Sequence, residues 1–162
     1  MDANLFRSDK LGIKLEVAAG LPIWEASPVI LHQKAVDRIR ETLKPPAPDS
    51  GKSCACIHYA AIYVQFPDGS LKRPDVSIFC EEPKELEDAV NSVPDAIIEV
   101  ISKSYEAKDL EISPPVYLSN GVKDVVVFNP YTDEIFHFKN GEKRNLTAPL
   151  AIEFECGCSC AI

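Results

Sequence analysis

The sequence predicts an α/β domain with a central mixed β-sheet flanked by helices. A segment that begins near residue 28 carries apolar residues at helical spacing. Two short apolar runs, 96–101 and 122–128, have the composition of strands that are buried on both faces. The polar stretch between them, 104–120, predicts a crossover helix. The expected order is therefore helix, strands, crossover helix, strands.

The size and composition of the chain indicate one domain. The 162 residues, with 46% hydrophobic content, suffice for one buried core but not for two ordinary domains. We expect a single domain over 1–162, with its core at about 15–155 and a Cys-rich tail at 156–162. The sequence contains no apolar run of about 18 residues and no signal-peptide pattern, so the expected location is cytoplasmic, with no membrane partner.

The first expected elements are a short strand with a turn, within residues 12–20, and then a helix. Ser27-Pro28 supplies the N-cap and the first helical residue. An apolar face and two terminating prolines follow: Leu31, Ala35, Val36, Ile39 and Leu43, then Pro45 and Pro46. His32 on this helix is expected to be structural, and the carboxylates of Glu16 and Glu25 are expected to face solvent.

The middle of the chain predicts a hairpin. Residues 56–66 are rich in strand-forming side chains, and 67–69, with the sequence Pro-Asp-Gly, supply a turn. The next apolar strand begins at Asp75. The acidic segment 81–92 is expected to be a solvated loop or a short helix.

The last third predicts a broken helix and more strands. Pro114 and Pro115 interrupt the crossover, so Ser113 is expected to cap a short second helical piece that ends near Gly121. Strand 122–128, a turn and a hairpin partner at 134–139 follow. Residues 146–154 are expected to form an edge segment.

Two carboxylates on apolar strands carry the chemistry. Glu99 lies inside an apolar run, where stripping water from an ionised carboxylate costs on the order of several kcal/mol unless a cation compensates. Asp75 begins another apolar strand. If the two strands are neighbours, the carboxylates lie about 4 to 6 Å apart and form a divalent-cation site. That arrangement is typical of a metal-dependent phosphodiesterase.

The motifs resemble a known family. Arg-Pro-Asp-Val at 73–76 and Pro-Asp-Ala-Ile-Ile-Glu-Val-Ile-Ser at 94–102 are the main ones. Others lie in order around them: Ser27-Pro28, His32-Gln33, Asp109, Tyr117, Gly121-Val122 and Asn129-Pro130. The series, over about 15–155, is similar to the Uma-type putative restriction-endonuclease family, a branch of the PD-(D/E)XK nuclease superfamily.

The resemblance implies a restriction-endonuclease-like core, Mg²⁺ or Mn²⁺ as cofactor, and DNA as the hydrolysed substrate. By analogy, Asp75 is the aspartate of the Pro-Asp motif and Glu99 the first residue of the Glu-x-Lys motif. Together with the Val100 carbonyl they supply the hard oxygen ligands that such a cation prefers. Cutting both strands of DNA takes two active sites, so we also expect a homodimer that uses the 134–139 hairpin or the C-terminal strand.

The chain departs from the family at its lysine. The Glu-x-Lys position holds Ile101, and Ser113 stands where the family usually has a lysine four residues after the aspartate that matches Asp109. On a continuing strand Lys103 points to the same face as Glu99, so we predict Lys103 as the catalytic replacement. Whether Lys108 reaches the site depends on the conformation of the crossover segment, which the sequence does not define.

Other interpretations remain open. Asp75 can serve only the backbone amides at a strand start, and Glu99 can pair with Lys103 or Arg38 in a structural network. The net charge of −8 and the missing lysine favour a degenerate nuclease-fold module that binds DNA or a protein. A plain oligomeric scaffold is a third hypothesis.

The six cysteines form a second constellation. Cys54-Ala55-Cys56 and Cys156-Gly157-Cys158-Ser159-Cys160 have one-residue gaps, whereas structural zinc sites typically space their ligands two to four residues apart. We therefore expect free or redox-variable thiols. A zinc site is the alternative, if the C-terminus packs beside the loop after the first helix.

Overall fold

A mixed six-stranded sheet forms the centre of the protein, whose computed structural model describes residues 10–26 and 28–162. Its strands run in the order β10-β9-β8-β7-β6-β3, with bounds Glu142–Thr147, Glu134–Lys139, Asp124–Asn129, Ala96–Val100, Val76–Phe79 and Ile57–Ala60. Strands β7 and β8 are parallel, and the other neighbouring pairs are antiparallel. The predicted fold class, α/β with a mixed sheet flanked by helices, is therefore confirmed.

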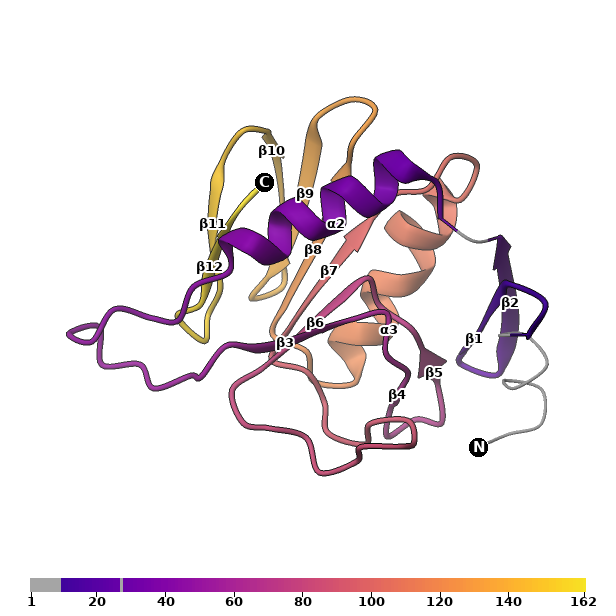
Figure 1. The fold of residues 1–162 in the computed structure, drawn as a ribbon, viewed down its shortest axis with the longest axis horizontal. Helices are drawn as coiled ribbons and strands as arrows, with labels where there is room; N and C mark the ends of the chain where they lie inside the picture. Colours follow the sequence, from indigo (N-terminus) through magenta and orange to yellow (C-terminus); the bar gives the residue numbers. More distant parts are fainter. Residues whose placement is uncertain (1–9, 27) are drawn as a thin grey trace.

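A smaller sheet lies at one side of the molecule (Figure 1). It has the order β2-β1-β5-β4, with bounds Leu21–Ala26, Ile13–Ala18, Leu71–Lys72 and Val64–Gln65. The prediction of a single strand at 56–66 is wrong, because the chain bends at Ala61, whose φ of 53° is left-handed. Its two halves become β3 and β4, which belong to different sheets.

Helices cover both faces of the six-stranded sheet. Helix α2, Ile30–Thr42, packs Val36 and Ile39 against Ile98 and its neighbours on one face. On the other face, α3 (Ser113–Ser119) packs Tyr117 against Ile97. A π-helical turn, η1 (Lys108–Ile112), leads into α3. Every residue of β7 is buried, as expected of a central strand.

Two details of the predicted helices differ. The N-cap position of α2 is Val29; the predicted cap, Ser27, lies outside the described residues. Leu31 is exposed, and the buried face is formed by His32, Val36 and Ile39, which are spaced at i, i+4 and i+7. Ser113 is the first residue of α3 and not its cap.

The C-terminal segment packs into the core. Residues 156–162, expected to form a tail, contribute β12 (Ser159–Ala161), which pairs with β11 (Ala151–Glu153). Ser159 also bridges Lys44 after α2. The expectation of free thiols is wrong for four cysteines, which form the disulfides Cys54–Cys80 and Cys56–Cys158. Among the described residues, no helix is long and apolar enough to cross a membrane.

Candidate active site

Strand pairing places Asp75 beside Glu99. Strand β6 runs antiparallel to β7 with Val76 opposite Ile98, so the next residues outward are Asp75 and Glu99. The Asp75 N–H donates to Glu99 Oε2 (3.2 Å), and the Val100 N–H donates to Asp75 Oδ2 (2.8 Å). Directly opposed residues of an antiparallel pair project to the same face. The structure thus brings together Asp75, Glu99 and Val100.

Glu99 is held in a fully buried position. The Tyr117 hydroxyl, from α3, donates to Glu99 Oε1. Burial and the negative charge of Asp75 raise the pKa of Glu99 to about 8. The charged form of this carboxylate is therefore left without full compensation by the surrounding protein.

The pKa of Asp75 is shifted in the opposite direction. Burial alone would raise its pKa, but a hydrogen bond with His32 and the positive charge of Lys14 outweigh that effect and lower the pKa to about 2. The His32 Nε2 atom lies 3.0 Å from Asp75 Oδ2. His32 is buried, as a structural histidine would be, but it is also part of the site.

A buried network of acids and lysines surrounds the pair. The Lys72 ammonium donates to Glu16 Oε2 (2.7 Å), and Lys14 Nζ lies 3.5 Å from Glu16 Oε1. Lys108 contacts both Glu16 (3.6 Å) and Glu25. The expectation that Glu16 and Glu25 face solvent is wrong, since they are only 0% and 7% exposed. The lysines hold the pKa of Glu16 well below its usual range, against the effect of burial.

The Glu16 carboxylate also fixes the approach to Asp75. Its Oε1 atom accepts a hydrogen bond from the Arg73 N–H (2.7 Å), two residues before Asp75. The small sheet, which carries Glu16 on β1, is thereby joined to the start of β6. A chain that lacked this carboxylate would lose a polar contact that positions the Asp75 segment.

The lysines near the site are not where the sequence predicted them. Strand β7 ends at Val100, and Lys103 lies exposed in the following turn, so the alternation argument for Lys103 is wrong. Ile101, at the Glu-x-Lys position, is fully buried. The Ser113 hydroxyl instead contacts the ammonium of Lys72 (3.0 Å). Sequence reasoning missed Lys72, which stands only three residues before Asp75.

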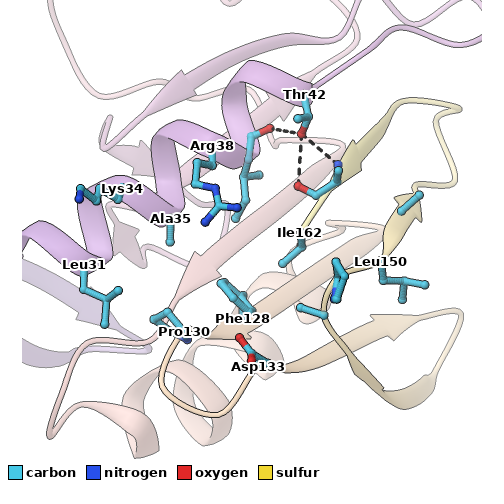
Figure 2. Close-up of a pocket in the computed structure, with 15 residues that line it drawn as sticks. Leu31, Lys34, Ala35, Arg38, Thr42, Phe128, Pro130, Asp133, Leu150 and Ile162 are labelled. Carbon is cyan, nitrogen blue, oxygen red and sulfur yellow. Dashed lines mark hydrogen bonds between the residues drawn. The ribbon is translucent and has the colours of Figure 1, made fainter.

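A cleft opens over Asp75. It has a volume of about 510 Å³, and its lining includes Lys14, Glu25, His32, Arg73 and Asp75. A larger groove of about 810 Å³ lies elsewhere, between α2 and the C-terminal strands (Figure 2). That groove contains neither Asp75 nor Glu99, whereas the smaller cleft is lined by Asp75, with the fully buried Glu99 behind it.

The donors of the site fit a hard divalent cation. Carboxylate and carbonyl oxygens are the ligands that Mg²⁺ and Mn²⁺ prefer. Within the described part of the chain, the Asp75 carboxylate is hydrogen-bonded through Oδ2, which leaves Oδ1 available on a residue that lines the cleft. A cation would also compensate the charge of Glu99.

Comparison with known proteins gives first the fold and then the family. A crystal structure of a putative nuclease belonging to DUF820, from Anabaena variabilis, matches with a TM-score of 0.59 and 16% identity, over 85% of this chain and 79% of that one. This likeness shows a shared fold. No curated protein sequence matches the chain. The Uma2 family model, described as a putative restriction endonuclease, matches residues 4–153, so the chain belongs to that family.

Proposed function

We propose that the protein is a metal-dependent endonuclease that hydrolyses DNA phosphodiester bonds. The observation that carries this proposal is the pair Asp75 and Glu99 on one face of adjoining strands, beside an open cleft. Both carboxylates and the Val100 carbonyl would hold Mg²⁺ or Mn²⁺. When bound, such a cation lowers the pKa of a coordinated water and neutralises charge on the phosphate.

The surrounding side chains orient the two carboxylates. His32, on α2, fixes Asp75 Oδ2 from one side, and the Val100 N–H fixes the same oxygen from the strand. Tyr117, on α3, fixes Glu99 Oε1. Because these donors come from different elements, the acidic pair is preorganised by the fold.

Lys14 is the lysine best placed to meet the substrate phosphate. It lines the cleft with Asp75, and its side chain is 16% exposed. Its positive charge acts on both Asp75 and Glu99. Lys72 and Lys108 are more deeply buried and neutralise the acids around them. We therefore assign the phosphate-binding role to Lys14, with Lys103 as the competing candidate.

Nicking of supercoiled plasmid tests the activity. We expect cleavage with Mg²⁺ or Mn²⁺, none with EDTA, and none with a Glu99→Gln variant that remains folded by circular dichroism. Lys14→Met should lower the rate at least about tenfold, or roughly 1.4 kcal/mol of transition-state stabilisation. Lys103→Ala is the matched control and should cut like the wild type. The reverse ranking of the two lysines would return the role to Lys103.

A nuclease-fold protein that binds DNA or a protein without cutting DNA is the second candidate. It is favoured by the hydrophobic Ile101 at the motif position, and within this candidate the net charge of −8 favours a protein partner over DNA. A wild type that binds Mn²⁺ and retains DNA in a salt-dependent manner, yet never nicks plasmid, would select this function.

A homodimer would supply the two sites that double-strand cleavage needs. Strand β9, which is the predicted segment 134–139, lies inside the sheet between β8 and β10, so the strand at this edge of the sheet is β10. Light scattering at micromolar concentration measures the assembly. A monomer would limit the enzyme to nicking single strands.

A further inference from the structure

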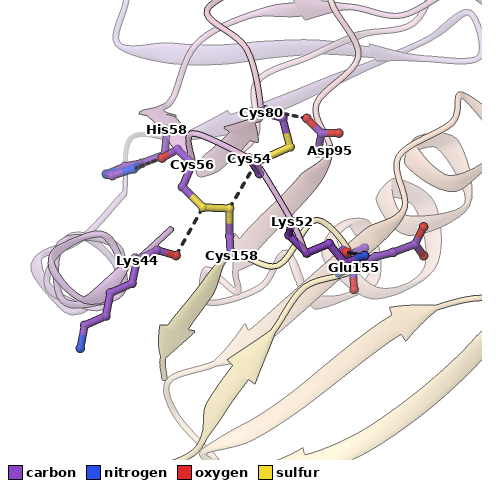
Figure 3. Close-up of a disulfide and its surroundings, with 10 residues drawn as sticks. Lys44, Lys52, Cys54, Cys56, His58, Cys80, Asp95, Glu155 and Cys158 are labelled. Atoms are coloured by element: carbon purple, nitrogen blue, oxygen red, sulfur yellow. Dashed lines mark hydrogen bonds between the residues drawn. A yellow bond between two sulfur atoms is a disulfide. The ribbon is translucent and has the colours of Figure 1, made fainter. Parts of the chain in front are cut away.

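Five sulfur atoms meet at the opposite end of β6 from Asp75. Cys80 directly follows this strand, and Cys54 and Cys56 come from the segment before β3. Cys156 and Cys158 come from the turn between β11 and β12. Figure 3 shows the side chains of Cys54, Cys56, Cys80 and Cys158 converging.

The sulfurs are spaced for a common ligand. The Sγ atoms of Cys54, Cys56 and Cys158 all lie within 4.8 Å of one another, as do those of Cys54, Cys80 and Cys156. Cys158 Sγ is 3.5 Å from Cys54 Sγ. Four thiolates around one tetrahedral zinc ion, at Zn–S distances of about 2.3 Å, are separated by about 3.8 Å. Cys54 and Cys158 are already close to this separation, and after reduction the two bonded pairs have to move apart to reach it.

The backbone explains how one-residue gaps can work here. Cys56 has a left-handed backbone, with a φ of 52°, so the segment is not a regular extended strand, and the Sγ atoms of Cys54 and Cys56 lie within 4.8 Å of each other. The Ala55 N–H between them donates to the Cys80 carbonyl (3.2 Å), which holds this segment against the end of β6. The ligand spacing typical of zinc sites is thus replaced by convergence of three segments.

We propose that the reduced protein binds one Zn²⁺ ion through Cys54, Cys56 and Cys158, with Cys80 or Cys156 as the fourth ligand. Disulfide pairing leaves one of the five sulfurs unmatched, because their number is odd. Soft sulfur donors in a tetrahedral set select zinc over the hard cations that suit Asp75 and Glu99. The core position of Cys158, with 0% exposure, is typical of a closed structural site.

The metal-bound and disulfide forms are alternatives. Reduction of Cys54–Cys80 and Cys56–Cys158 takes two electrons and two protons per bond, which a dithiol reductant supplies while it is oxidised to its own disulfide. The four ligand thiols then lose their protons as zinc binds. A dithiol and Zn²⁺ together convert one form into the other.

Metal analysis of the wild type tests the proposal without any variant. The full chain is reduced with a dithiol under anaerobic conditions, loaded with Zn²⁺ and desalted. We expect one zinc per chain, and Co²⁺ in its place should give the intense near-ultraviolet absorption of cobalt–thiolate bonds. A reduced, folded chain that retains no zinc, or that binds Co²⁺ without thiolate absorption, overturns the site.

Serine variants identify the ligands. Cys158→Ser and the double variant Cys80→Ser/Cys156→Ser should lose the bound zinc. Cys160→Ser is the matched control, because Cys160 is buried nearby but belongs to neither sulfur group, and it should retain the metal. Zinc retained by Cys158→Ser, or lost from a folded Cys160→Ser, contradicts the assignment. Plasmid nicking by the same variants reports separately on the acidic site.

Discussion

The two ends of β6 differ in how they accommodate reactive groups inside a core. At Asp75 the groups are oxygen acids, and lysines and hydrogen-bond donors offset their charge. At Cys80 the groups are sulfurs, which pair with each other. Charge compensation depends on which groups carry protons, whereas pairing of the sulfurs depends on whether the thiols are oxidised to disulfides. The first end should therefore respond to pH and the second to redox conditions, on a single short strand.

Removing the buried lysine of the acidic end should have the largest effect on stability. Lys72→Met leaves the fully buried Glu16 without its shortest ion pair, and breaking such a pair typically destabilises by about 3 to 5 kcal/mol. Urea denaturation measures this loss. The control is Lys103→Met, at an exposed position, which should stay within about 0.5 kcal/mol of the wild type. Equal stability of the two variants would show that the network contributes little.

A methyl group added at Gly157, beside the cysteines, should have the next largest effect on stability. Gly157, between Cys156 and Cys158, has a φ of +94°, and a Cβ there would lie 2.8 Å from Pro46 Cβ and 2.9 Å from Lys52 Cβ. Left-handed strain and overpacking together predict a loss of about 2 to 4 kcal/mol for Gly157→Ala.

Gly141→Ala is the matched control for that substitution. Gly141 also has a positive φ, +76°, but a Cβ would meet no atom within 4 Å. We expect only the conformational cost, about 1 kcal/mol. If thermal or urea unfolding shows equal losses of stability for the two variants, the close packing around Gly157 does not contribute to the effect.

Stability should depend on pH through Glu99. Its pKa is raised to about 8 in the folded protein from an ordinary value of 4.5, so the folded state binds more protons than the unfolded state between these values. Metal-free protein should therefore lose stability as pH rises through this window, by up to about 1.4 kcal/mol per pH unit. The stabilising shift of Asp75, toward a pKa of about 2, is already fully present there.

The check is urea denaturation of wild type and Glu99→Gln across the same pH range in EDTA. The variant cannot ionise at this position, so its stability curve should be flatter. A wild-type curve that rises with pH in parallel with the variant would show that Glu99 ionises normally.

The smallest expected effect is the coupling between the two ends. Cys80 lies five positions after Asp75, roughly 16 Å along the strand at about 3.3 Å per residue. In a double-mutant cycle, the losses from Asp75→Asn and Gly157→Ala should add within about 0.5 kcal/mol. A larger coupling energy would mean that β6 transmits strain from one cluster to the other.

Local patterns of the sequence were enough to predict much of the fold. Strand β9 has the bounds predicted for the hairpin partner after the turn, and the turn at 67–69 joins β4 to β5. Asp75 and Glu99 were identifiable because a carboxylate in an apolar strand is conspicuous wherever that strand lies. Their pairing followed from one assumption, that the two strands are neighbours, and the register confirms it.

Contacts between distant parts of the chain could not be predicted in this way. The burial of Glu16 depends on Lys72, 56 residues away, and nothing near Glu16 in sequence indicates that partner. Lys103 was preferred because the strand was assumed to continue, although β7 ends three residues earlier. The cysteine pairing could not be predicted without knowing that the C-terminal segment packs back against the sheet.

The bond between Cys56 and Cys158 also shapes the unfolded chain. Their separation is 102 residues, so it closes a ring that contains Asp75 and Glu99 and leaves two free ends. In the chain-entropy treatment, a closed loop of about 100 residues disfavours the unfolded state by about 4.7 kcal/mol. A zinc ion held by the same two residues would close the same ring. Unlike the disulfide, that ring would open on unfolding, because the zinc ligands separate as the site unfolds.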